Sequence, residues 1–522
     1  MDYVHAFDRI AGFFAGNPTD PQAWAGAIAG AQRMSRRRDE VEDVLEAQQG
    51  QRGAPARAVE SARLLRDPKT VAVVTGQQAG LFGGPLFTLL KAATAIRLAR
   101  DVTAKHGVAA VPIFWIDAED HDWDEVKSCG LLDPDLQLVQ ASLDSPVGAN
   151  ERPVGWIALD QSAAGAVEAL EAALPPSEYT PDLVARLKAA YQPGEPMAGS
   201  FARWMESVLG PAGLVVFDAS DPAAKPLVAD LFVREVEQAG ATSRCAAAAG
   251  ERLAALGYHA QVAPSDQSLA LFELDGVRTP IRHQDGQFTI GSRTLTRGAL
   301  IDAIRLTPER FSPNVLLRPL VQDTLFPTVC YVAGPNELAY LGQLKDVYQA
   351  FGVPMPLMYQ RLSATIVDSN AMRFLSRSDV AFEALRARDE AALNQLLSAQ
   401  LPASVDRAMQ EAAQGLQDRM EALARAVMQI DATLEGAARS ALGRMQDDLR
   451  KLQGKVIQAA KRKDDTLRRQ FTHAQAQAFP GGEPQERAIG FVYFLNKFGP
   501  SLLDRLEEEL PLDMGTHWVI AL

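Results

Sequence analysis

Two short apolar runs, each ending in a polar cluster, constrain the fold of this chain most. Residues 71–74 form the apolar, β-branched stretch expected of a buried parallel strand, and residues 108–116 repeat it. Between them, from about residue 85 to residue 106, apolar residues recur at helical spacing. Because open α/β sheets bind ligands where parallel strands end, we expect the two following loops to lie side by side above one sheet.

The loop after the first run is rich in glycine, which permits sharp turns and brings backbone N–H groups close to a ligand. The amino end of the following helix could hold a phosphate or a carboxylate, with added charge from a nearby lysine. The glycine spacing fits neither the dinucleotide fingerprint nor the phosphate loop of ATPases, so neither chemistry follows from it. A tight connection without a ligand is the alternative. The candidate binding residues here are Thr75, Gly76, Gln77, Gln78, Gly80, Gly83, Gly84 and Lys91.

The second run leads directly into six acidic residues around one histidine, His121. Histidine has an ordinary pKa near 6.5, which makes this residue the best candidate for a general base or proton shuttle. If the extended backbone continued, Glu119 and His121 would point one way and Asp120 and Asp122 the other. A structural hydrogen-bond cluster is the alternative. A metal site is disfavoured because adjacent Asp, His and Asp side chains rarely converge on one ion. The catalytic candidates are His121, Asp120, Asp122 and Glu119.

A later segment repeats the order of strand, glycine, proline and helix. An apolar run at 328–333 precedes Gly334 and a proline, and a helix is expected through about residue 351. Asn336, Glu337 and Tyr340 would stand at its entrance. Asn314 and Arg318 lie four residues apart, so on a helix they would share a face, where Arg318 could bind a carboxylate through two hydrogen bonds. An internal salt bridge from Arg318 to Glu337 or Asp323 is the alternative.

The remaining patterns divide the chain into five expected segments. Residues 21–49 are predicted to be helical, and 214–218 is predicted to be a strand ending in Asp218. Residues 269–290 contain two Asp-Gly pairs between apolar runs, which predicts a small antiparallel addition. The expected segments are N-terminal helices with the first Rossmann half (1–130), a mainly helical insertion (131–212), the second Rossmann half (213–400), a coiled-coil arm (401–480) and a C-terminal segment on the core (481–522).

An apolar seam begins near Pro402. Apolar residues alternate spacings of four and three from 409 to 430 and again from 438 to 459, as a coiled coil requires. Two consecutive spacings of four between these stretches fit either a hairpin turn or a stutter in one helix. We favour an antiparallel hairpin whose second helix ends near residue 479. The arm is expected to form a homodimer.

Several long motifs resemble the BshC family, which is associated with the cysteine-ligase step of bacillithiol biosynthesis. They are TGQQAGLFGGPLFTLLKA, PIFWIDAEDHDWDEV, SPNVLLRPLVQDTLFPTVCYVAGPNELAYLGQLK and FLNKFGPSLLDRL, and the resemblance spans nearly the whole chain. It implies a Rossmann-like core with inserted segments, a projecting helical coiled coil and a homodimer. It also implies addition of L-cysteine to glucosaminyl malate. Asp117 stands where the family is expected to have a small residue, and Asn336 where it is expected to have glycine.

Composition narrows the class of protein further. With 522 residues and 47% hydrophobic content, the chain should form more than one structural unit around a substantial core. A net charge of −13 argues against nucleic-acid binding. Three cysteines without a C-x-x-C pair fit a reducing compartment. The sequence starts without a signal-peptide pattern and has no apolar run of membrane-spanning length, so we expect a cytoplasmic protein that binds no membrane.

Two functions from different classes follow. In the first, the chain is a ligase with L-cysteine and glucosaminyl malate as substrates and ATP as the suspected co-substrate. The cysteine carboxylate would be activated, and His121, held by Asp120 or Asp122, would take a proton from the attacking amine. The N–H groups of loop 76–84 would stabilise developing negative charge. No metal motif is present. In the second, the chain is a non-catalytic nucleotide-sensing or scaffolding dimer that uses the coiled-coil arm.

Overall fold

A five-stranded parallel sheet forms the centre of the first part of the chain. Its strand order is β12-β11-β1-β2-β5, and every pairing is parallel. The apolar, β-branched sequences of these strands suit burial on both faces, and almost all of their residues are buried. The predicted α/β class with a Rossmann-like parallel sheet is confirmed. The strands are β1 (Val71–Gln77), β2 (Ala110–Ile116), β5 (Val215–Asp218), β11 (Thr328–Ala333) and β12 (Leu357–Gln360).

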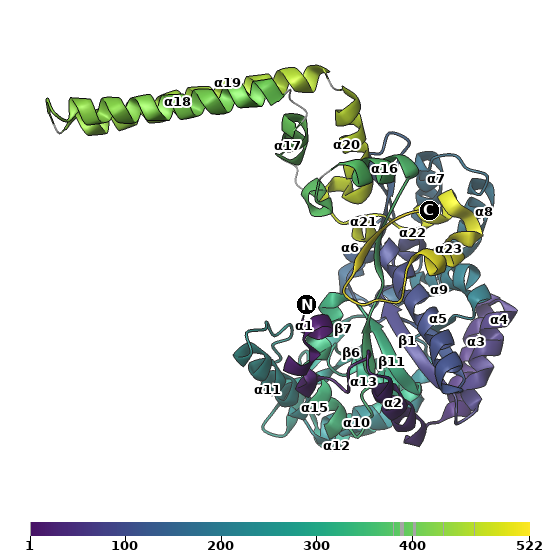
Figure 1. Cartoon of the computed structure of the whole chain (residues 1–522). Helices are drawn as coiled ribbons and strands as arrows, with labels where there is room; N and C mark the ends of the chain where they lie inside the picture. The colour runs from purple at the N-terminus through teal and green to yellow at the C-terminus, as the bar shows by residue number, and fades with distance from the viewer. Residues whose placement is uncertain (1, 379, 387–390, 400–402, 432, 464) are drawn as a thin grey trace. The chain divides into compact units, whose positions relative to one another are not determined.

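The computed structural model describes residues 2–378, 380–386, 391–399, 403–431, 433–463 and 465–522 (Figure 1). The chain forms two compact units, one of residues 1–365 and 486–518 and the other of residues 366–485 and 519–522. Two expected positions, the boundary between residues 400 and 401 and the start of the arm at Pro402, fall within the second unit. Both lie outside the described residues.

Helices surround the parallel sheet. The longest in this unit is α5 (Leu86–His106), which contacts β1, β2 and β11 and carries the apolar face predicted for it. The other α-helices of at least six residues described in this unit are α2 (Pro21–Arg33), α3 (Arg38–Arg52), α4 (Ala56–Arg63), α7 (Ser162–Ala173), α8 (Thr180–Ala190), α9 (Met197–Leu209), α10 (Ala229–Glu237), α11 (Ala241–Ala255), α12 (Arg297–Leu306), α13 (Arg318–Leu325), α14 (Pro335–Leu341), α15 (Lys345–Ala350), α22 (Phe491–Phe498) and α23 (Leu502–Glu509).

The helix expected over residues 21–49 is two helices. The backbone adopts an extended conformation at Met34, and α3 starts only at Arg38. Arg36 stabilises this break because its guanidinium donates to the carbonyl of Ala31, near the end of α2, and to the carbonyl of Asp323. Arginine can satisfy helix-end carbonyls in this way, so its role here is structural.

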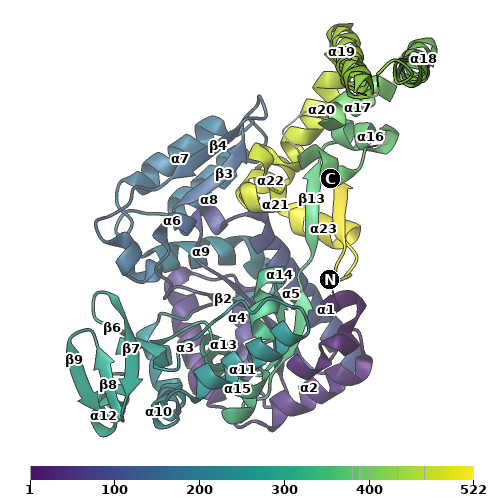
Figure 2. The same cartoon turned by 90° about the vertical axis from the view of Figure 1, so that its left-hand side faces the viewer.

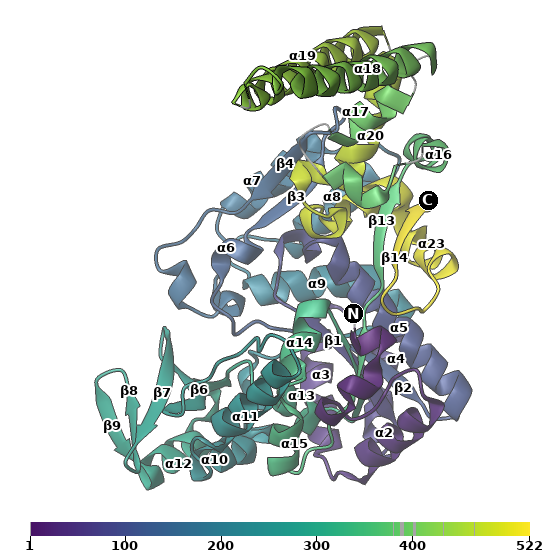
Figure 3. The same cartoon turned by 60° about the vertical axis from the view of Figure 1, so that its left-hand side comes forward.

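Two smaller β structures add to the first unit. The insertion after β2 contains a hairpin, β3 (Ser128–Leu132) with β4 (Leu138–Ser142), and the helices α6 (Trp123–Val126), α7 (Ser162–Ala173) and α8 (Thr180–Ala190). The predicted antiparallel addition is a sheet of order β10-β6-β7-β8-β9, which lies to one side of the parallel sheet in Figures 2 and 3. Its strands are β6 (Ser268–Leu274), β7 (Arg278–Gln284), β8 (Gln287–Ile290), β9 (Arg293–Thr296) and β10 (Phe311–Pro313).

The second unit contains the coiled coil. Helices α18 (Ala403–Val427) and α19 (Leu434–Lys463) lie side by side in Figures 1 to 3. Gln446 of α19 donates to Gln417 of α18, which fixes an antiparallel hairpin register. The preferred hairpin is therefore confirmed over one stuttered helix, although the second half continues as a separate helix, α20 (Asp465–Ala478). Helices α16 (Ser369–Arg377) and α17 (Ala391–Ala399) complete the main elements of this unit.

Candidate active site

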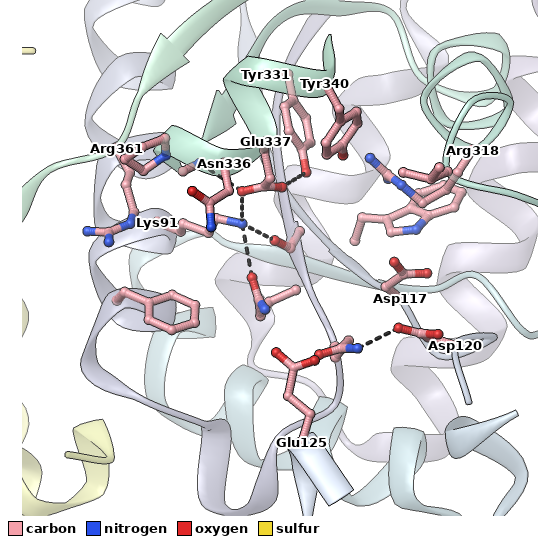
Figure 4. A pocket seen from close by; sticks show the side chains of 18 of the residues that line it. Lys91, Asp117, Asp120, Glu125, Arg318, Tyr331, Asn336, Glu337, Tyr340 and Arg361 are labelled. Carbon is pink, nitrogen blue, oxygen red and sulfur yellow. Dashed lines mark hydrogen bonds and ion pairs between the residues drawn. The ribbon is translucent and has the colours of Figure 1, made fainter. Parts of the chain in front are cut away.

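The expected meeting of two loops at one sheet edge is observed. Gln77, the last residue of β1, pairs with Ile116, the last residue of β2, and the N–H of Asp117 donates to the carbonyl of Gln77 at 3.0 Å. Above this edge lies a cavity of about 400 Å³, a size suited to small molecules. Its lining is Gly76, Gln77, Gln78, Phe87, Lys91, Trp115, Asp117, Asp120, Glu125, Arg278, Pro313, Asn314, Val315, Arg318, Tyr331, Gly334, Pro335, Asn336, Glu337, Tyr340, Arg361 and Arg487 (Figure 4).

Lys91 ties the floor of the cavity together. Its buried ammonium donates to the carbonyl of Gly76 at 2.7 Å, to Oε1 of Gln77 at 3.0 Å and to the carboxylate of Glu337 (Figure 4). An ammonium has three donors, so all of them are used. Lys91 therefore joins β1, α5 and α14, and its charge is already balanced by Glu337.

Glu337 is the other half of this pair. Burial acts to raise the pKa of its carboxyl, but Lys91, the N–H of Gly334 and the hydroxyl of Tyr331 outweigh burial and hold that pKa below its usual value. The carboxylate therefore stays charged and fully hydrogen-bonded. Glu337 and Lys91 shape the cavity rather than offering a free charge to a ligand.

The amino end of α5 is closed by a distant segment of the same unit. The N–H of Leu86, the first residue of the helix, donates to the carbonyl of Ile489 at 2.8 Å, and the N–H of Phe491 donates to the carbonyl of Gly84. The glycines serve this packing: a Cβ at Gly83 would lie 2.1 Å from the ring of Phe491. The expected anion at this helix end is therefore not supported.

Three of the predicted loop glycines lie outside the cavity lining. The N–H groups of Gly80, Gly83 and Gly84 donate to carbonyls within their own loop, to Gln78, Gly80 and Leu81 respectively. Thr75 is also outside, because it is buried in β1 and its hydroxyl donates to the carbonyl of Val332 at 2.9 Å. The proposed use of these N–H groups to stabilise negative charge has no geometric basis for these residues.

The alternating arrangement expected for the acidic loop is wrong, because β2 ends at Ile116 and the backbone turns. Glu119 points away from the cavity and forms a buried ion pair with Lys225. Asp122 caps α6 by accepting the N–H of Glu125 at 3.1 Å. Neither residue lines the cavity, and each has a clear structural role.

Asp120 and His121 remain next to each other. Asp120 lines the cavity, and its carboxylate accepts from the amide of Gln78 at 2.5 Å (Figure 4). Nδ1 of His121 lies 3.3 Å from Oδ1 of Asp120 and 3.5 Å from the guanidinium of Arg278. The imidazole is about half exposed and lies outside the lining. Asp120, rather than Asp122, is thus placed to orient His121, and the catalytic role of the pair stays a prediction.

Arg318 brings a guanidinium group to the cavity, near the carboxyl of Asp117. Its side chain is 8% exposed and donates to Oε1 of Gln322 at 3.2 Å, but it forms no ion pair with any described residue. The internal salt bridges considered from the sequence are therefore absent in the described structure. Asp323 is instead bonded to Tyr348, and Glu337 to Lys91. The guanidinium lies 5.7 Å from the centre of the Tyr331 ring, which helps to hold it in place.

Three buried N–H donors in the lining have no partner in the described structure. They are Nε1 of Trp115, Nε of Arg278 and Nε of Arg361. Buried polar groups in proteins are nearly always hydrogen-bonded, so each such donor calls for an explanation. All three belong to residues of one lining, which favours this cavity as a polar binding site.

Two acids in the lining have raised pKa values. Burial raises the pKa of the Asp117 carboxyl, although nearby Arg318 acts in the opposite direction. Burial also raises the pKa of Glu125, against a hydrogen bond from Gln78. Carboxyls with raised pKa values in a cavity are candidates for proton transfer. Asp117 is one of the two positions where the sequence departs from the expected family pattern.

Eleven of the eighteen site residues predicted from the sequence line the cavity. These are Gly76, Gln77, Gln78, Lys91, Asp120, Asn314, Arg318, Gly334, Asn336, Glu337 and Tyr340. Among the residues that were missed, Arg361 directly follows β12 and Trp115 is near the end of β2, so attention to every strand end would have found them. Arg278 follows a hairpin turn and Arg487 comes from the end of the chain, and no local pattern marks either.

No group of three His, Cys, Asp or Glu side chains among the described residues is arranged to hold a metal ion. In the same part of the chain, no helix has both the length and the apolar character needed to cross a membrane.

Comparisons with known proteins cover the whole chain. Residues 1–362 match the model of the family described as "Bacillithiol biosynthesis BshC, N-terminal Rossmann-like domain", and residues 364–522 match "Bacillithiol biosynthesis BshC, C-terminal coiled-coil domain". Relatives named "Putative cysteine ligase BshC" include one from Salinibacter ruber, 36% identical over 100% of this chain and 95% of its own length. Another, from Koribacter versatilis, is 35% identical over 90% of this chain and 87% of its own length. With both domains and nearly the full length matched, this chain belongs to the BshC family.

Proposed function

We propose that this protein is a ligase that joins L-cysteine to glucosaminyl malate through an amide bond, the final step in making bacillithiol. One observation carries the proposal: Arg318, which forms no ion pair with a described residue, and three residues with unsatisfied N–H donors all line one cavity at the sheet edge. A malate group carries the carboxylate oxygens that such donors prefer. The family names of the relatives agree with this class of reaction.

The charges of the cavity suggest where each part of the substrates binds. Arg318 would hold a carboxylate of the malate group. Arg361, which two hydrogen bonds to Glu486 at 2.6 and 2.9 Å fix in place, lies on the opposite side of the pocket in Figure 4 and would meet another part of the substrates. The amine groups of the two substrates would face the acidic side of the cavity, formed by Asp117, Asp120 and Glu125.

Amide formation requires activation of the cysteine carboxylate, because a carboxylate resists attack by an amine. ATP would supply this activation by converting the carboxylate into an acyl phosphate or an adenylate. Because the start of α5 is closed, it offers no helix terminus to the phosphates of ATP. Arg487, an exposed residue of the lining beside the Phe87 ring, is therefore the better placed cation for these phosphates. In our proposal the glucosaminyl amine then attacks the activated carbonyl, and the C–O bond to the phosphate or adenylate breaks, so that phosphate or AMP leaves. His121, oriented by Asp120, takes the proton released from nitrogen.

We also propose that the protein is a homodimer joined through the α18–α19 hairpin. No described side chain of this hairpin is buried, and seam residues such as Leu423 and Leu452 are about half exposed. An apolar seam that a single chain leaves open is suited to a second copy. Size-exclusion chromatography with light scattering tests this: the parent should have twice the chain mass, and Leu423→Asp with Leu452→Asp should reduce it to one chain.

The ligase proposal is tested by mixing the purified protein with ATP, L-cysteine and glucosaminyl malate and following the condensed thiol by mass spectrometry. Arg318→Gln should lower kcat/KM for glucosaminyl malate by roughly 10- to 100-fold, the loss expected for a charged hydrogen-bonding pair. Arg425→Gln, which changes an exposed arginine of α18, is the matched control.

A second arm of the experiment separates catalysis from scaffolding. His121→Ala should lose most of the condensation rate while keeping the parent's thermal unfolding. Lack of product under every nucleotide and metal condition, from protein that is folded and dimeric, would instead favour a scaffolding dimer.

A further inference from the structure

The second unit contains a cavity that the proposed ligase reaction does not use. It measures about 570 Å³ and lies along α16 and α20, which contact each other in Figures 1 and 2. Three arginines line it, Arg373 and Arg377 from α16 and Arg469 from α20, together with His473. We call this the basic groove. No residue of its lining is acidic, although the whole chain carries a net charge of −13.

The guanidinium groups of the groove form no ion pair with the described part of the chain. Arg377 and Arg469 have no hydrogen bond or ion pair with any described residue, and Arg373 bonds only within its own helix, to Ser369 and Asn370. Arg373 and Arg377 stand four apart on one helix, where like charges repel and destabilise the helix. Within the described residues, these repelling charges are therefore placed together without an ion pair to compensate them.

Asp368, whose carboxylate bonds His473 of the lining, does not compensate this charge. Asp368 caps α16 through the N–H groups of Asn370 and Ala371, at 3.0 and 2.8 Å, and accepts from Nε2 of His473 at 2.7 Å. Burial acts to raise the pKa of Asp368, but these hydrogen bonds outweigh it and hold that pKa below its usual value. The carboxylate of Asp368 is thus already hydrogen-bonded to the start of α16 and to His473.

The floor of the groove is apolar. Phe374 and Leu467 are buried beneath it, and the ring of Phe374 packs edge-on against Phe471 at 6.3 Å between centres. Three cations above such a floor suit a compact molecule with at least two negative charges. Planar guanidinium groups match phosphate and carboxylate geometry with paired hydrogen bonds.

We propose that the basic groove binds a small polyanion, whether a phosphate ester or a polycarboxylate. The volume is in the range of small-molecule sites, and bound negative charge would relieve the repulsion between Arg373 and Arg377. This site is separate from the cavity at the sheet edge and does not depend on the ligase activity.

Hydrogen exchange of the full chain, read by mass spectrometry, tests the proposal because it locates binding as well as detecting it. Pyrophosphate and citrate are the two probes, one for each source of negative charge. Either probe should slow exchange in peptides covering α16 and α20. The protection should weaken at high salt, and Arg377→Gln with Arg469→Gln should raise the probe concentration needed for half-protection by at least roughly 10-fold.

Arg407→Gln with Arg425→Gln is the matched control, since it removes two exposed arginines of α18 in the same unit. This variant should retain the parent's protection. Protection of α16 and α20 that is unchanged in the groove variant, or absent with both probes at millimolar concentration, would overturn the proposal. Stronger protection by a short DNA duplex than by either probe would also overturn it, in favour of a nucleic-acid surface.

Discussion

A buried glutamate outside both cavities should make the stability of the first unit depend on pH. Glu235 of α10 is fully buried, and no described cation pairs with it. Its carboxyl accepts from the N–H of Ala270 at 2.8 Å and from the hydroxyl of Thr242 at 2.5 Å. Burial raises the pKa of this carboxyl to about 7, against these two hydrogen bonds, from an ordinary value of 4.5.

The size and sign of the effect follow from this difference in pKa. A carboxyl whose folded-state pKa is raised stabilises the fold fully below the unfolded pKa, and this stabilisation is lost as pH rises through the folded pKa. For Glu235 the window runs from about 4.5 to about 7. A difference of about 2.5 in pKa corresponds to about 3 kcal/mol, at about 1.4 kcal/mol for each pKa unit. Above the window the charged glutamate therefore costs about 3 kcal/mol.

Glu235→Gln keeps an acceptor for Ala270 and removes the charge. Its free energy of unfolding should be close to the parent's near pH 5 and exceed it by about 3 kcal/mol at pH 8. Urea unfolding followed by tryptophan fluorescence is the appropriate assay, because all six tryptophans lie in the first unit. Glu237→Gln, an exposed change on the same helix, should show the parent's pH dependence. A constant difference between Glu235→Gln and the parent from pH 5 to pH 8 would refute the reasoning.

Three further substitutions test contacts around the candidate active site. Lys91→Met should lower the free energy of unfolding by about 3 to 5 kcal/mol, because it leaves Glu337 as a buried charge without its partner; a loss below about 1 kcal/mol in urea unfolding would contradict this. Lys225→Met should cost a similar amount through Glu119, whereas adding Glu119→Leu should recover most of the loss, and a double variant no more stable than the single one would argue against the ion pair as the cause. Gly83→Ala should destabilise the protein by more than about 2 kcal/mol, since φ at Gly83 is +94° and Phe491 fills the space that the new Cβ would need. Gly165→Ala on the exposed face of α7 should instead stabilise it by about 0.5 to 1 kcal/mol. Equal midpoints of thermal unfolding for the two variants would contradict this difference.

The fold was predictable where its signals are local. Apolar β-branched runs predicted four strands of the parallel sheet, and the Asp-Gly pairs predicted the hairpins of the antiparallel sheet. At one of these turns, Asp285 and Gly286 both adopt positive φ. The coiled-coil seam gave α18 and α19. The break between α2 and α3 was missed because Arg36 stabilises it through the carbonyl of Asp323, nearly 290 residues later.

The candidate site was predictable to the extent that strand ends define it. Asp120, Glu337 and Arg318 were found because they follow strands or stand beside them in sequence. The placement of Glu119 was not, because its direction depends on Lys225, a partner about a hundred residues away. Likewise, no rule based on sequence spacing shows that Ile489 occupies the end of α5, since only the packed fold brings these segments together.

The closure of α5 by Ile489 also sets an order of events during synthesis. Residues 366–485 form the second unit, yet they are made before the segment that completes the first. Arg487 of the cavity and Ile489 at the helix start leave the ribosome only after the whole coiled-coil hairpin has emerged. Until then the nascent first unit exposes the start of α5 and an incomplete cavity, so chaperones should encounter this protein mainly before residues 486–518 are added.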